Sequence, residues 1–326
     1  MSRFGITLPF DRTKMADHRA VVEELVDLGY SDVWSAEASA TDGFTPLAMT
    51  AAWAPSLQLG TAIVPSFTRG PATLAMCVAT MAEAAPGHFT FGLGTSSDVI
   101  VERWNGIAFE EPYKRNRDMV RFLKAALTGA KVDESYDTFA VRGFRLERPP
   151  EVVPPILVAA LRPGMLRLAG READGTIINW LSAEDVRKIV PEVGAGKEVV
   201  CRIYVCVTED AATLRSQAKT LIAAYLNVKV NAAFQEWVGR GPKLEQMWAC
   251  WKAGDRKAAL EAIGDDVVDE LVVHGTAEEC RAHLKRYVDS GVTVPVLMPL
   301  PLAGVAAIDT VRQLAPAGRL AGAGDR

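Results

Sequence analysis

Histidine is scarce in this chain, and its few copies lie in the wrong places for a metal centre. The 326 residues include four histidines, which all fall on expected helices or connections and not at the end of an expected strand: His18, His88, His274 and His283. Zinc hydrolases usually bind their metal through several imidazoles and carboxylates, so we expect no metal site. The expected strands also contain no lysine, which leaves a Schiff-base aldolase without its nucleophile.

Cysteine is sparse too, and its spacing does not form a disulfide framework. The five cysteines contain no C-x-x-C pair: Cys77, Cys201, Cys206, Cys250 and Cys280. Cys201 and Cys206 fall on one expected strand at an odd separation, so they point to opposite faces. We therefore expect buried free thiols in a reducing cytosol.

Basic runs and long apolar runs are missing as well. The formal net charge is −4, and the 36 basic residues are scattered along the chain, whereas a nucleic-acid partner usually requires a concentrated basic face. No apolar run approaches the roughly 20 residues that span a bilayer. The N-terminal MSRFGITLPF leads directly into an expected strand and does not resemble a signal peptide. We expect a cytoplasmic protein with neither a nucleic-acid nor a membrane partner.

What the chain does contain is a regular alternation of short apolar strands and amphipathic helices, in a composition that is 49% apolar. Strands are expected at 3–9, 31–37, 57–65, 89–94, 156–160, 175–179, 199–207 and 294–298. Strands separated by helices indicate a parallel sheet. Eight such units favour a closed (β/α)8 barrel, of the α/β class, over an open doubly wound sheet. We expect one domain that covers residues 1–326.

Two segments interrupt this alternation. Residues 128–150 are polar and are expected to form a hairpin-like insertion, and a second insertion covers about residues 229–264. The second one carries apolar residues at helical spacing: Phe234, Trp237, Leu244, Met247, Trp248 and Trp251. The favoured interpretation is a helix that packs on the barrel or on a second subunit. The alternative is a lid that closes over a site and excludes water.

The stretch FTFGLGTSSD at 89–98 ends an apolar strand in glycines and hydroxyl side chains. In barrels of this kind the chemistry lies at the carboxyl ends of the strands. Gly92, Gly94, Thr95 and Ser96 form either a glycine-lined turn that packs strand against helix or a backbone nest for an anion such as a phosphate. The other strand ends carry few acid–base groups. This shortage indicates that the reactive atoms belong to a bound cofactor.

Two longer stretches resemble a known family. LGTAIVPSFTRGPATLAMCVATMAEAAPGHFTFGLGTSS (59–97) and PPILVAALRPGMLRLAGREADGTIINW (154–180) are similar to the two signatures of the bacterial luciferase-like superfamily, and the opening RFGITLPF and the DVWSAE strand extend the resemblance over most of the chain. The closest branch is that of the oxidoreductases that use the deazaflavin coenzyme F420. The resemblance implies a barrel with a flavin or deazaflavin at its rim, ring inward and phosphate outward, and a homodimer.

The resemblance also implies which residues contact the cofactor. Ala62 and Ile63 match a non-proline cis bond that forms a bulge behind the ring. Gly94, Thr95 and Ser96 match family residues that contact the ribityl and phosphate region of the cofactor. Ala160, Leu161 and Arg162 match a second loop on the phosphate side. Arg162 is either a charged partner of the phosphate or a solvated surface arginine.

Glu37, at the end of the second strand, is expected to contact the edge of the cofactor ring or to deliver a proton. The alternative is that its carboxylate caps a loop or pairs with an arginine. Asp11 and Asp42 are weaker candidates of the same kind. Trp180 is expected to wall the substrate pocket, unless it only packs. Sugar-phosphate dehydrogenases of this branch have a catalytic histidine where this chain has Ala38, which argues against glucose-6-phosphate as the substrate.

The leading hypothesis is therefore an oxidoreductase that transfers a hydride between coenzyme F420 and an apolar small-molecule substrate. One alternative is an FMN-dependent monooxygenase of the same fold, whose flavin has a nitrogen where the deazaflavin has a carbon. The other alternative is a barrel without a cofactor that serves as a binding or scaffold protein.

Overall fold

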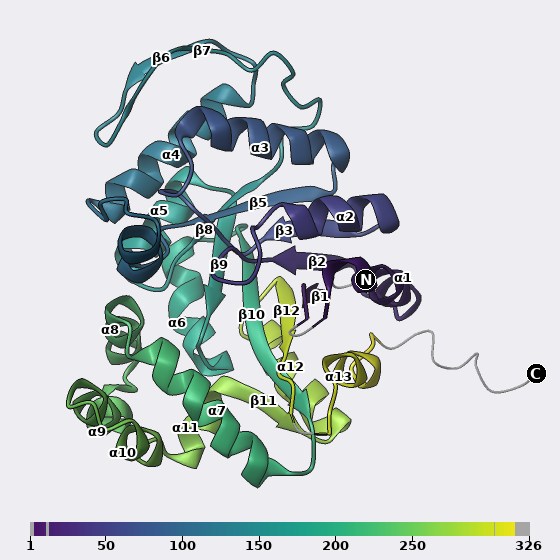
Figure 1. The fold of residues 1–326 in the computed structure, drawn as a ribbon, viewed down its shortest axis with the longest axis vertical. Coiled ribbons are helices and arrows are strands. Elements are labelled where there is room, and N and C mark those ends of the chain that lie inside the picture. Colours follow the sequence, from purple (N-terminus) through teal and green to yellow (C-terminus); the bar gives the residue numbers. More distant parts are fainter. Residues whose placement is uncertain (1–2, 11–12, 303, 317–326) are drawn as a thin grey trace, which may run out of the picture.

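A closed barrel of parallel strands forms the centre of the computed structural model, which describes residues 3–10, 13–302 and 304–316 (Figure 1). Each barrel strand pairs in parallel with the next, and the last pairs with the first. In order they are β1 (Gly5–Thr7), β2 (Asp32–Ser35), β3 (Gln58–Thr61), β5 (Phe89–Gly94), β8 (Ile156–Ala159), β9 (Gly175–Asn179), β10 (Glu198–Val207) and β12 (Val294–Pro299). The expected (β/α)8 barrel is confirmed.

The helices between these strands cover the outside of the barrel (Figure 1). They are α1 (His18–Asp27), α2 (Thr45–Trp53), α3 (Pro71–Ala84), α4 (Pro112–Ala126), α5 (Pro163–Glu172), α6 (Ala183–Val193), α7 (Ala211–Leu226), α12 (Ala277–Asp289) and α13 (Ala307–Gln313). Proline opens α3, α4 and α5, where its fixed φ fits the first turn and its missing N–H costs no hydrogen bond. The α6 and α12 helices instead begin with capping boxes, Ser182 with Asp185 and Thr276 with Glu279.

The lower half of the barrel interior is filled by apolar side chains around Trp34, which is fully buried. Residues from five further places on the barrel wall complete this layer: Leu157, Ile177, Val200, Val294 and Val296. Gly60 makes room for the indole, because a Cβ atom there would lie 2.3 Å from ring carbons of Trp34. These described residues fill the barrel interior around Trp34, so a ligand would not fit at their level.

Several element boundaries were not predicted. The expected strand at 57–65 is two strands, β3 and β4 (Val64–Pro65), separated by Ala62 and Ile63. Two 3-10 or π-type turns, at Met15–Asp17 and Val99–Trp104, were not expected. The α11 helix (Asp265–Leu271) and the β11 strand (Val272–Gly275) were also missed, and β11 pairs with the outer half of β10.

The first expected insertion is confirmed as a hairpin of β6 (Val132–Ser135) and β7 (Ala140–Phe144), which lies over α3 and α4 at the top of Figure 1. The second forms α8 (Lys229–Val238), α9 (Gly241–Lys252) and α10 (Arg256–Glu261) beside α7. Phe234, Leu244 and Met247 are fully buried there, and Arg240 of this insertion forms ion pairs with Asp185 and Glu270. These contacts confirm the interpretation that the segment packs on the barrel.

Within the described residues, no helix combines the length and the apolar character needed to cross a membrane.

Replacing Gly92 by alanine should destabilise the fold. A Cβ atom at Gly92 would lie 1.9 Å from the carbonyl oxygen of Thr61, a backbone atom that cannot move without shifting β3. We expect G92A to lower the free energy of unfolding by about 1–3 kcal/mol, measured by urea denaturation. The matched control is G164A in α5, where a Cβ atom meets nothing within 4 Å; it should leave stability unchanged or raise it by about 0.5–1 kcal/mol. Equal stability of G92A and G164A would contradict this packing.

Candidate active site

The Ala62–Ile63 segment interrupts the barrel wall at the carboxyl end of β3. Its peptide bond is cis, as the resemblance implied. The Ala62 N–H donates to the carbonyl oxygen of Ser35 at 2.6 Å, and the carbonyl oxygen of Ile63 accepts from the N–H of Glu37 at 3.0 Å. The segment is thus held on the side of β2 by two backbone hydrogen bonds.

On its other side the segment lies against the glycines of β5. A Cβ atom at Gly94 would lie 2.8 Å from Cγ1 of Ile63 and 3.1 Å from Cβ of Ala159. Gly92 in turn exchanges hydrogen bonds with Thr61, whose Oγ1 donates to its carbonyl oxygen at 2.9 Å and accepts from its N–H at 2.8 Å. Both glycines therefore allow β5 to approach the Ala62–Ile63 segment closely. The two glycines thus pack strand against strand, whereas the sequence predicted a turn that packs strand against helix. The alternative of an anion nest stays a prediction.

The residues that follow Gly94 have unused hydrogen-bond donors. The backbone N–H groups of Thr95 and Ser96 donate to no described residue, and Ser96 has a left-handed φ of 62°. The same holds for the N–H groups of Leu161 and Arg162, just before α5. Because β5 and β8 are neighbours, these two loops leave the barrel side by side. Backbone N–H groups that have no partner in the protein are available to bind an anion, as in a nest.

The second loop, at the carboxyl end of β8, contains Ala160, Leu161 and Arg162. Ala160 is buried and its N–H donates to the carbonyl oxygen of Ile177 at 3.1 Å. The side chain of Arg162 forms no ion pair with a described residue, and it precedes the first turn of α5. The structure thus brings together the two sequence-predicted phosphate-side loops and places the cis bond beside them.

Glu37 lies at the same end of the barrel, in contact with an arginine. Its Oε1 accepts from Nη1 of Arg69 at 2.6 Å and from Oγ1 of Thr68 at 3.2 Å, and its Oε2 accepts from the N–H of Gly43 at 3.0 Å. The side chains of Glu37 and Arg69 are 14% and 20% exposed. Burial lowers the pKa of Arg69, but its hydrogen bond and attraction to Glu37 outweigh this and raise the pKa above the ordinary value.

These contacts are those of the alternative interpretation, an ion pair that also caps a loop. Contact of Glu37 with a ring edge stays a prediction. Asp42 accepts from the N–H groups of Phe44 and Thr45 at the start of α2, at 2.8 and 2.9 Å. Burial opposes ionisation of Asp42, but the hydrogen bonds from Thr45 and Phe44 lower its pKa. Asp11 lies outside the described residues.

Trp180 is enclosed by aromatic rings. It is 2% exposed, its ring centroid lies 4.1 Å from that of Tyr204 and 5.1 Å from that of Tyr225, and its carbonyl oxygen accepts from Nε2 of Gln235 at 2.8 Å. This is a packing arrangement, and a role as a pocket wall stays a prediction. Burial raises the pKa of Tyr204, so its hydroxyl remains protonated.

Arg202 is a residue of the mouth that sequence reasoning missed. It lies on β10, and its Nη1 donates to the carbonyl oxygen of Ala62 at 2.8 Å, across the barrel. The signal in the sequence was a single charge within the otherwise apolar run VVCRIYVCV. A charge at an inward position of a buried strand needs an explanation.

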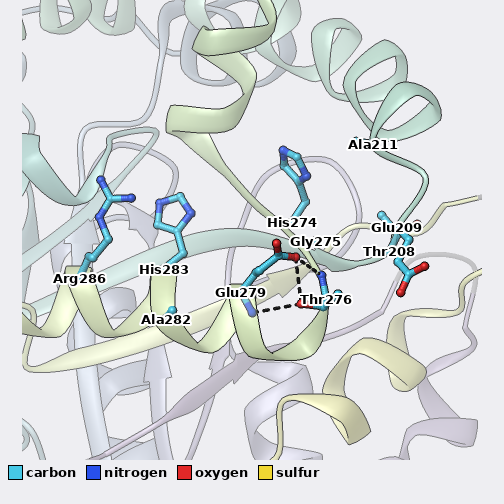
Figure 2. A pocket seen from close by; sticks show the side chains of 10 residues that line it. All are labelled: Thr208, Glu209, Ala211, His274, Gly275, Thr276, Glu279, Ala282, His283 and Arg286. Carbon is cyan, nitrogen blue, oxygen red and sulfur yellow. Dashed lines mark hydrogen bonds between the residues drawn. The ribbon is translucent and has the colours of Figure 1, made fainter.

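Two cavities lie away from this mouth. One, of about 570 Å³, lies beside the start of α12 and is lined by residues that include His274, Thr276, Glu279 and His283 (Figure 2). Thr276 and Glu279 hydrogen-bond to each other there, and Nε2 of His274 contacts Asp269 at 2.8 Å. The other, of about 630 Å³, lies between α3 and the segment after β7. Neither cavity contains a residue that the sequence predicted for the site.

Comparison with known proteins identifies the family to which the chain is similar. Residues 2–294 match the family described as luciferase-like monooxygenase. The chain is 27% identical over 304 residues to 5,10-methylenetetrahydromethanopterin reductase of Methanolobus tindarius, covering 89% of this chain and 92% of the relative. It is 25% identical over 316 residues to a putative coenzyme F420-dependent oxidoreductase of Mycobacterium tuberculosis, covering 86% and 90%.

The fold also matches a solved structure. Coenzyme F420-dependent tetrahydromethanopterin reductase from Methanopyrus kandleri superimposes with a TM-score of 0.76 at 20% identity, over 92% of this chain and 93% of the other. At this identity the match supports the barrel architecture.

The pair Glu37–Arg69 should stabilise the mouth. Removing the carboxylate leaves a largely buried guanidinium without its partner, so E37Q should lower the free energy of unfolding by about 1.5–3 kcal/mol. R69M and the double variant complete a cycle in which the two losses are less than additive. The control is E23Q, which breaks the exposed pair of Arg19 and Glu23 and should cost about 0–1 kcal/mol. Equal losses in the free energy of unfolding for E37Q and E23Q, measured by urea denaturation, would show that the pair of Glu37 and Arg69 contributes no more than an exposed surface ion pair.

Proposed function

Since the chain belongs to the luciferase-like monooxygenase family and is an enzyme, we propose that it transfers a hydride between coenzyme F420 and an apolar small-molecule substrate. The choice of F420 over other cofactors is supported by the names of the relatives, which include a putative coenzyme F420-dependent oxidoreductase. The direction of transfer depends on the substrate.

The observation that carries the proposal is the pair of neighbouring loops with unused N–H donors beside the Ala62–Ile63 segment. The cofactor has a flat heterocycle at one end and a phosphate along its side chain, so it needs a smooth apolar surface and a cluster of donors. The partly exposed side chain of Ile63 would supply the first, with the buried Ala62 beneath it, and the N–H groups of Thr95, Ser96 and Leu161 would supply the second. The residues present therefore fit the group.

The bound cofactor would supply the hydride chemistry, because the mouth has few groups that could do so. The contribution of the chain is to bind and orient. Close approach of β5 to the Ala62–Ile63 segment fixes one wall of the mouth, and the ion pair of Glu37 with Arg69 fixes the loop next to it. Holding two reactants within about 3–3.5 Å of each other can supply several kcal/mol of the barrier.

FMN is the alternative cofactor, because the family description names monooxygenases. Both heterocycles need the same flat surface and the same phosphate donors. A flavin has a nitrogen at the position where F420 has the hydride-accepting carbon, so the two differ in their reaction with oxygen. They also differ in their ring substituents and in the side chain beyond the phosphate, which a binding site can distinguish.

Titration with each cofactor separates these possibilities. We expect F420 to quench the fluorescence of the seven tryptophans with a dissociation constant at least about tenfold lower than that of FMN, a difference of about 1.4 kcal/mol. Tight FMN binding without a response to F420 would identify the monooxygenase. The absence of a response to either would favour a barrel without a cofactor.

Replacing Arg162 by glutamine tests the second loop. If its guanidinium lies by the phosphate, R162Q should weaken F420 binding about three- to tenfold and reduce its dependence on salt. R167Q is the control, because Arg167 lies on the same helix and pairs with Glu192 on the surface. Identical affinities of R162Q and R167Q between low and high salt would show that Arg162 is a solvated surface residue.

A further inference from the structure

Arg202 points into the barrel. On β10 it is two residues from Val200, which belongs to the apolar layer around Trp34, so the two side chains share the inward face of the strand. Arg202 follows Val200 toward the carboxyl end, and its guanidinium reaches the carbonyl oxygen of Ala62 across the barrel. The guanidinium therefore lies on the floor of the mouth, directly above the packed interior.

The guanidinium of Arg202 has few hydrogen-bond partners among the described residues. Its Nη1 donates to Ala62, but Nε is buried and has no hydrogen-bond partner. No carboxylate among the described residues lies within ion-pair distance of it. The phenols of Tyr204 and Tyr225 lie near enough to Arg202 to influence its pKa.

An unpaired charge in such a place is costly. Burial lowers the pKa of Arg202 below its ordinary value, yet a guanidinium remains protonated in proteins. Arg69, in the loop that follows β4 at the same end of the barrel, has a carboxylate partner at 2.6 Å. Because removing an isolated charge from water without a partner is unfavourable, the position of Arg202 indicates that an electron-rich ligand completes its environment.

We propose that Arg202 sets the redox balance of the cofactor bound in the mouth, by stabilising the reduced ring more than the oxidised ring. The proposal rests on the proposed function. Gain of a hydride brings two electrons and one proton to the ring, which lowers the ring's charge by one unit until a further proton follows. The hydride comes from the reduced form of the substrate, which is thereby oxidised, in one direction, and in the other it passes to the oxidised form, which is thereby reduced. A fixed positive charge on the floor of the mouth favours the more negative state.

A purely structural role would have a different consequence. The hydrogen bond from Nη1 to Ala62 could hold the Ala62–Ile63 segment in place and do nothing else. Loss of that bond would weaken binding of oxidised and reduced cofactor alike. The ratio of the dissociation constants for oxidised and reduced cofactor therefore distinguishes an effect of the positive charge from a purely structural role of the hydrogen bond.

The test compares R202Q, which removes the charge and keeps a donor, with R202K, which keeps the charge and changes the donor. R202M is a second neutral variant in case R202Q does not fold, and R121Q is the control, because Arg121 lies on the surface in a pair with Glu172. Dissociation constants for F420 and for reduced F420 are measured anaerobically by tryptophan fluorescence, with thermal unfolding as a check on folding.

For R202Q and R202M we expect the preference for the reduced form to fall about tenfold, which corresponds to a potential about 30 mV lower for the bound two-electron couple. R202K should stay within about threefold of the wild type, and R121Q should equal it. An unchanged ratio in the neutral variants, or an equal loss in R202K, overturns the role of the charge. If the wild-type protein binds neither form of F420, the proposed function itself fails.

Discussion

The site depends on one steric constraint, the close approach of β5 to the end of β3. The carbonyl oxygen of Thr61 occupies the place where Gly92 would have a Cβ atom, and Ile63 occupies the corresponding place at Gly94. Only glycine at both positions lets the two strands meet in this way. The chain between them turns through Ala62 and Ile63, and the loop that continues from Gly94 then leaves the barrel with its N–H groups unpaired. One packing requirement thus produces both the wall and the donors of the mouth.

Charge at the mouth is arranged around this wall in two different ways. Arg69 is neutralised by Glu37 and stacks over the ring of Phe44 at 5.2 Å, which makes it part of the scaffold. Arg202 has no such partner among the described residues, and its Nη1 donates to the carbonyl oxygen of Ala62. The contrast explains why a mouth that is poor in acid–base groups can still influence a redox reaction. Its residues would act on a bound ring through position and a fixed charge.

The sequence predicted the barrel well because its strands are short, apolar and evenly separated by helices. Expected boundaries at 89–94, 175–179, 183–193 and 211–226 agree with β5, β9, α6 and α7. The β11 strand was missed because VVHG follows a short helix without a turn signal and pairs outside the barrel. The loop after β5 was a candidate from its own glycines and hydroxyl residues, whereas the cis bond and the loop after β8 were located by resemblance, since no local pattern in Ala62–Ile63 indicates a cis bond. Pairing of Glu37 with Arg69 and the reach of Arg202 across the barrel depend on side-chain contacts between residues far apart in the chain, which periodicity does not reveal.

A crystal structure of the protein with coenzyme F420 would test the account most directly. We expect the ring to lie against Ile63 and Ala62 above Arg202, with the phosphate accepting from the N–H groups of Thr95 and Ser96 on one loop and Leu161 on the other. A ligand bound instead in the cavity beside α12 (Figure 2), or a mouth in which these N–H groups face away from the bound molecule, would contradict it.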